Sequence, residues 1–154
     1  MATVEPLIQR LRSKPGIQTS QVNDAWKVRF AAPAGFFTEL TIAEEAIEWF
    51  VTVHSEAGAP VWSDWCDYLG YEKNQDPAKE LAAMVSDIEW FVDTMAEVKG
   101  FRVWSEPVFR KFGITLGRHK VAEWLRHDRW QRVALSDVDL DSSLPPMVRE
   151  RQIA

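Results

Sequence analysis

The pentapeptide Ile47-Glu48-Trp49-Phe50-Val51 occurs a second time, unchanged, at Ile88–Val92. A Val-Trp-Ser step and an acidic residue follow each copy, at residues 61–64 and 103–106. The chain is therefore either a tandem duplication, or one in which the same five residues adopt two different local structures. The two alternatives predict different folds and different binding surfaces, because the duplicated unit would be a helix-turn-helix.

The first copy has the pattern of a half-buried strand. In an extended chain Ile47, Trp49, Val51 and Val53 lie on one side, while Phe50 lies on the other with Glu48, Thr52 and His54. The β-branched run at residues 51–53 also favours a strand. A helix remains the alternative, because residues 41–44 form a capping-box sequence. The strand is the favoured interpretation.

The second copy lies in a sequence that predicts a helix near 77–98. Asp76 is a suitable N-cap, and Pro77 is favoured at the first helical position. Lys99-Gly100 is a typical stop. Between these signals runs an apolar stripe at helical spacing, made of Leu81, Met84, Val85, Ile88, Phe91, Val92 and Met95.

These patterns predict an α+β fold, with an antiparallel sheet packed on the long helix near 77–98. The sheet would consist of a meander and C-terminal hairpins, one of them turning at His127-Asp128. We expect one domain over residues 1–154, with 1–20 and 137–154 as peripheral ends. The alternative is a mostly α-helical fold of tandem winged helix-turn-helix units.

Composition predicts a soluble, cytoplasmic protein. The lone Cys66 excludes a disulfide within one chain, which favours a reducing compartment. Residues 1–12 lack the basic start and apolar run of a secretory signal. No stretch approaches the roughly 20 apolar residues of a membrane helix, so no membrane partner is expected.

The charged residues are unevenly distributed along the chain. The formal net charge is −5, yet residues 39–98 hold 14 acidic residues and 2 lysines, a net charge of −12. Residues 99–132 hold 9 basic and 3 acidic residues, a net charge of +6. The two segments would form an acidic and a basic face, unless they pair with each other across the fold.

No common catalytic or cofactor-binding motif is present. The three histidines lack the spacing of metal ligands, and there is no second cysteine to assist them. The seven glycines form neither a GxGxxG nor a GxxxxGK[ST] loop. We therefore expect a non-enzymatic protein without a metal or cofactor.

The acidic, aromatic stretch at residues 61–68 is the most interface-like feature. Trp and Tyr are common binding anchors, and surrounding carboxylates suit a basic partner. The alternative is that Trp62 and Trp65 belong to the core and that the acidic residues are only solvated. A domain of this kind would mask a basic protein, as an immunity protein neutralises a bacterial toxin or an inhibitor blocks an enzyme. The residues expected to bind the partner are Glu44, Glu45, Glu48, Trp62, Asp64, Trp65, Asp67, Tyr68 and Glu72.

Under the alternative fold, the basic 99–132 segment would bind DNA. Residues 118–125 would form a recognition helix, and residues 130–135 the wing. Nucleic acid is an expected partner in this case alone. The contacts to phosphates and base edges would come from Arg118, Lys120, Arg126, Arg129 and Arg132.

Overall fold

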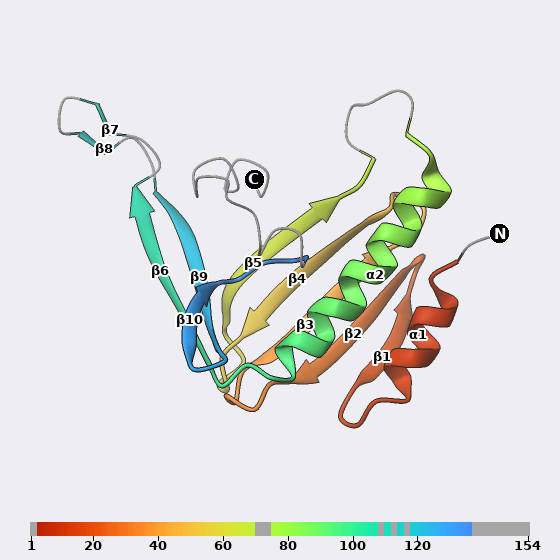
Figure 1. Cartoon of the computed structure of the whole chain (residues 1–154), viewed down its shortest axis with the longest axis horizontal. Coiled ribbons are helices and arrows are strands. Elements are labelled where there is room, and N and C mark those ends of the chain that lie inside the picture. The colour runs from red at the N-terminus through yellow and green to blue at the C-terminus, as the bar shows by residue number, and fades with distance from the viewer. Residues whose placement is uncertain (1–2, 70–74, 108–109, 112–113, 116–117, 137–154) are drawn as a thin grey trace.

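The computed structural model describes residues 3–69, 75–107, 110–111, 114–115 and 118–136 of the 154-residue chain. In this part of the chain the strands pair into a five-stranded sheet, a three-stranded sheet and a two-stranded hairpin (Figure 1). Two helices, α1 and α2, accompany them. The α+β prediction is confirmed, including one long helix and an antiparallel meander.

The five-stranded sheet is a meander in which each strand pairs antiparallel with the next along the chain. Its strands are β1 (Gln18–Val22), β2 (Ala25–Ala31), β3 (Phe37–Ala43), β4 (Glu48–His54) and β5 (Pro60–Asp67). Burial alternates along β4, where Trp49, Val51 and Val53 are buried while Phe50 is exposed. This alternation is the one expected of a strand that covers a core with one face.

The repeated pentapeptide occupies two different structures. In the first copy Ile47 ends a turn with a positive φ of 49°, and the remaining four residues begin β4. In the second copy all five residues lie inside α2. Ladder hydrogen bonds to β3 and β5 hold the first copy extended, so tertiary context overrides local sequence. The tandem helix-turn-helix alternative is therefore wrong.

Helix α2 (Pro77–Met95) starts where the sequence predicts and ends slightly earlier. The Asp76 side chain accepts a hydrogen bond from the Ala78 backbone N–H at 3.1 Å, which caps the helix. Gly100, expected as the helix stop, instead begins strand β6. A Cβ at Gly100 would lie 3.0 Å from Cη2 of Trp130, so the missing side chain leaves room for that indole.

Both helices lie on the same side of the five-stranded sheet (Figure 1). Aromatic rings join the layers: Trp49 of β4 meets Phe91 of α2 edge to face, with ring centroids 5.4 Å apart. Phe91 also lies 6.0 Å from Trp124, which belongs to the second sheet. Fully burying each such side chain contributes about 1.5–3 kcal/mol, so these three rings are a large part of the core.

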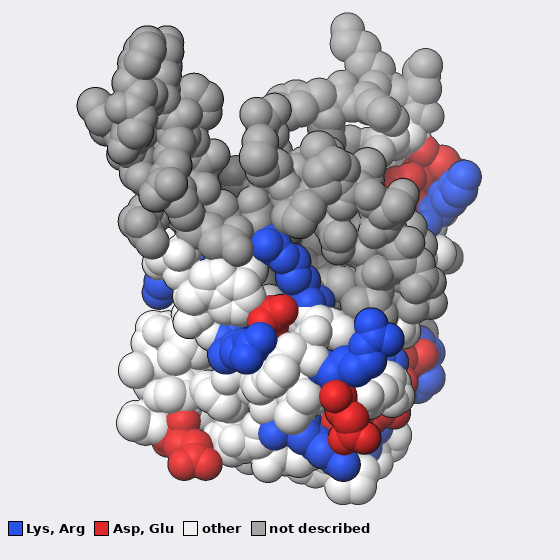
Figure 2. Space-filling model, turned by 60° about the vertical axis from the view of Figure 1, so that its left-hand side comes forward, with Lys and Arg blue, Asp and Glu red and all other residues white. Residues whose placement is uncertain are grey.

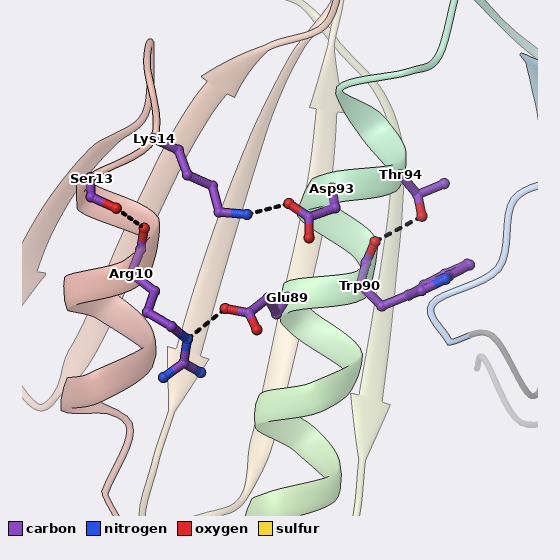
Figure 3. A network of polar contacts seen from close by, with 7 residues as sticks. All are labelled: Arg10, Ser13, Lys14, Glu89, Trp90, Asp93 and Thr94. Atoms are coloured by element: carbon purple, nitrogen blue, oxygen red, sulfur yellow. Dashed lines mark hydrogen bonds and ion pairs between the residues drawn. The ribbon is translucent and has the colours of Figure 1, made fainter.

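Helix α1 (Glu5–Arg12) lies within residues 1–20, a segment expected to be peripheral. Its apolar face is nevertheless part of the core, because Leu7, Ile8 and Leu11 are all buried. Two ion pairs, Arg10–Glu89 at 2.7 Å and Lys14–Asp93, fasten it to α2 (Figure 3). The other expected peripheral segment, 137–154, lies outside the described residues.

The three-stranded sheet contains the predicted C-terminal hairpin. Its strands are β6 (Gly100–Pro107), β9 (Arg118–Arg126) and β10 (Arg129–Arg132), and the short strands β7 (Arg110–Lys111) and β8 (Ile114–Thr115) pair with each other. His127 and Asp128 connect β9 to β10 with φ values of 54° and 59°. Two positive φ angles are the signature of a type I′ hairpin turn, here formed without glycine.

We predict that Asp128→Gly raises the free energy of unfolding by about 0.5–1 kcal/mol. Glycine adopts a positive φ without the steric penalty that a Cβ carries. Urea denaturation monitored by circular dichroism measures the change. Asp128→Ala is the matched control and should lower the stability, since alanine has a Cβ but no side-chain oxygen to hydrogen-bond locally. Equal stability of the two variants would contradict the strained-turn interpretation.

Candidate functional site

The outer face of the five-stranded sheet, on the side away from both helices, carries the candidate site. Cross-strand register places Glu48 opposite Asp67 and Phe50 opposite Trp65. All four residues alternate with the buried side chains of β4 and β5, so they face outward. Phe50 is 40% exposed, which is unusual for a side chain of its size.

Phe50 and Trp65 form a stacked aromatic pair. Their ring centroids are 6.1 Å apart and their planes differ by 16°. The Trp65 indole N–H donates to Oε2 of Glu48 at 3.1 Å, which fixes the orientation of the ring. Asp67 is also oriented, because its Oδ1 accepts the Leu69 backbone N–H at 3.1 Å. A flat apolar surface therefore lies beside two positioned carboxylates, and we name Glu48, Phe50, Trp65 and Asp67 the acidic–aromatic patch.

On the part of the same sheet face that β2 and β3 form, acidic and basic side chains neutralise one another. Phe37 stacks on His54 with centroids 4.6 Å apart, and the Arg29 guanidinium lies 4.8 Å above the Phe37 ring. Glu39 pairs with Arg29 at 3.6 Å and with Lys27 at 3.7 Å. The charges of β2 and β3 thus compensate one another, in contrast to those of the acidic–aromatic patch.

Two of the residues predicted to bind a partner are buried on the helix side of the sheet. Trp62 is 7% exposed and Asp64 is 6% exposed, because both alternate with the outward-facing residues of β5. The expectation that they form part of an exposed surface is corrected by this strand geometry. The unexpected member of the patch is Phe50, and the signal for it was already present in the alternation of the first pentapeptide.

The other predicted partner-binding residues have varied positions. Glu45 is exposed in the turn before β4, close in sequence to Glu48. Glu44 accepts the Val4 backbone N–H through Oε1 at 2.6 Å, so it helps to hold the N-terminal segment. Tyr68 is partly buried, and Glu72 lies outside the described residues. Glu48, Trp65 and Asp67 are thus the predicted residues that lie together on the outer sheet face.

The predicted recognition helix at 118–125 is wrong, because these residues belong to β9. Arg126 pairs with Glu97 at 3.6 Å and lies 5.9 Å from the Trp90 ring centroid, so it has a structural role. Lys120 and Arg129 are exposed, Arg132 is half-buried, and the Arg118 side chain lies outside the described part. Figure 2 shows basic side chains interspersed with acidic and uncharged ones on one side of the molecule.

Tyr68 links the sheet to α2 through a partly buried polar network. Its hydroxyl accepts the Trp49 indole N–H at 3.1 Å and donates to Oδ2 of Asp87 at 2.6 Å. Burial raises the pKa of the Tyr68 phenol far above its ordinary value, and the neighbouring Cys66 and Asp87 raise it further. The neutral phenol is therefore a structural group that positions β5 against the helix.

This raised pKa predicts a loss of stability at high pH. Because the folded pKa exceeds the unfolded value of about 10, the contribution of Tyr68 is complete below pH 10 and declines above it. The decline should approach about 1.4 kcal/mol per pH unit. In Tyr68→Phe it should be absent, which urea denaturation between about pH 8.5 and 11 would reveal. Identical pH slopes in the two proteins would contradict this prediction.

Neither metal ligation nor similarity to known proteins assigns a role to this site. Among the described residues, no group of three or more His, Cys, Asp and Glu side chains is placed to hold a metal ion. In the same part of the chain, neither helix has the length and apolar character needed to span a membrane. Comparisons with protein-family models, curated proteins and solved structures find no match. Function is therefore inferred from the geometry of the sheet face.

Proposed function

We propose that the chain is a non-enzymatic protein-binding domain that docks a basic partner on the acidic–aromatic patch. The observation that carries this proposal is the stacked pair of exposed Phe50 and half-buried Trp65 beside Glu48 and Asp67. Soluble domains usually bury such rings, and contiguous exposed apolar surface rimmed by polar groups is typical of interaction sites.

The two kinds of side chain have complementary roles in binding. Trp65 and Phe50 supply rigid apolar area at low cost in conformational entropy, so they mainly determine how slowly the complex dissociates. Glu45, Glu48 and Asp67 attract a basic surface and accelerate association. Binding should therefore weaken as salt concentration rises, mostly through a slower association rate.

The finer proposal is that this domain neutralises its partner, as an immunity protein neutralises a cognate toxin in the cytoplasm or an inhibitor blocks an enzyme. Three features support it: the −12 charge of residues 39–98, the acidic–aromatic patch, and a sequence without common catalytic motifs. The partner would present lysines and arginines on the surface that binds nucleic acid or another anionic substrate. Docking would then cover that surface.

A capture experiment with the full chain as bait tests the proposal. The chain, immobilised and exposed to extract of its host, should retain a basic protein. Trp65→Ala should weaken that complex roughly 30-fold, which corresponds to the loss of about 2 kcal/mol typical of a truncated anchor residue. Surface plasmon resonance on the purified pair measures the change.

Trp130→Ala is the control, because Trp130 is a surface tryptophan that is 39% exposed and lies on the other sheet, whereas Trp65 is half-buried. It should change the affinity by less than about threefold, in the range of a non-anchor residue. The proposal is wrong if both variants bind alike. It is also wrong if the bait retains nucleic acid alone, with retention insensitive to Trp65→Ala.

A further inference from the structure

Arginine, aromatic ring and glutamate come together twice on the outer faces of the two sheets. The Arg102 guanidinium lies 4.1 Å from the Trp130 ring centroid, and its Nε and Nη2 donate to Oε1 of Glu123 at 2.8 and 2.6 Å. Arg29 repeats the arrangement, 4.8 Å above Phe37 and 3.6 Å from Glu39. In both cases the guanidinium stacks on the ring and pairs with a carboxylate from a neighbouring strand.

The acidic–aromatic patch has the same components except for the arginine. Glu48 and Asp67 face each other across β4 and β5, two register positions from Phe50 and Trp65 and on the same face of the sheet. Neighbouring pairs on one face of a sheet are about 7 Å apart, so the carboxylates lie beside the rings. Among the described residues, no lysine or arginine pairs with Glu48 or Asp67, and none stacks on Phe50 or Trp65.

We propose that this patch is an arginine-recognition subsite, in which an arginine of the basic partner stacks on the Phe50–Trp65 pair and hydrogen-bonds to Glu48 and Asp67. The inference rests on the proposed function and specifies the chemistry of the partner. The planar guanidinium can stack on a ring and form several hydrogen bonds in its own plane at once. The rounded, strongly hydrated ammonium of lysine stacks less well on a ring and does not form hydrogen bonds in one plane.

The charges and the geometry of the patch can be separated experimentally. Glu48→Gln keeps an oxygen that accepts the Trp65 indole N–H, and Asp67→Asn keeps one that accepts the Leu69 backbone N–H. The double variant therefore removes two negative charges while retaining the local hydrogen bonds. The Trp65 indole N–H resonance, assigned with Trp65→Phe, reports on the patch in ¹H–¹⁵N spectra.

The probes are N-acetyl-arginine amide and N-acetyl-lysine amide, titrated at low salt into the full chain. The Trp65 indole signal should shift at a concentration of the arginine probe at least about threefold lower than that of the lysine probe, because guanidinium stacks more strongly than ammonium on aromatic rings. The double variant should lose most of this response. The Trp130 indole signal should change little, because Arg102 already occupies its ring.

The possible results distinguish the two proposals. Equal responses to the two probes, or an undiminished response in the double variant, would overturn the arginine subsite. If the arginine subsite is overturned while a basic partner is still captured in a Trp65-dependent way, the proposed function stands and only the recognition of arginine is wrong. If the arginine probe is preferred but no basic protein is captured, the subsite stands and the proposed function fails.

Discussion

The edge-to-face contact between Trp49 of β4 and Phe91 of α2 is the interaction on which the remaining arrangement depends. It places the long helix across one face of the meander, and Trp124 extends the same cluster to the second sheet. Side chains alternate along a strand, so committing Trp49, Val51 and Val53 to the core sends Phe50 to the other face. The exposed patch is thus a direct consequence of the packing that stabilises the fold.

Much of the fold could be predicted from local sequence. The Asp76-Pro77 start and the apolar stripe together identify α2, whereas the alternation after Ile47 favours β4 but leaves a helix as the alternative. The end of α2 could not be predicted to the residue, because the chain leaves the helix to pair with β9 through the hydrogen bond from the Lys99 N–H to the Leu125 carbonyl. That contact joins residues far apart in sequence, and no local signal reveals it. The same limit explains why one pentapeptide forms a strand in one place and a helix in another.

The candidate site was only partly predictable, since charge counts ignore where carboxylates point. The −12 segment suggested a broad acidic surface, but several of its members have internal roles. Asp76 caps α2, Asp87 accepts the Tyr68 hydroxyl, and Glu89 binds Arg10 of α1. The carboxylates that remain beside the aromatic pair are those of Glu48 and Asp67. A surface of this size favours recognition of a particular cationic side chain over long-range attraction alone.

One face of the five-stranded sheet is buried, while the other is open to solvent. Paramagnetic relaxation by a soluble, uncharged gadolinium complex tests it most directly, because the effect depends on distance from solvent. This arrangement predicts strong broadening of the ring protons of Phe50 and Trp65, and little broadening of those of Trp49 and Trp124. Protection of Phe50 and Trp65 to the level of Trp49 would contradict it, because the proposed binding face would then be covered.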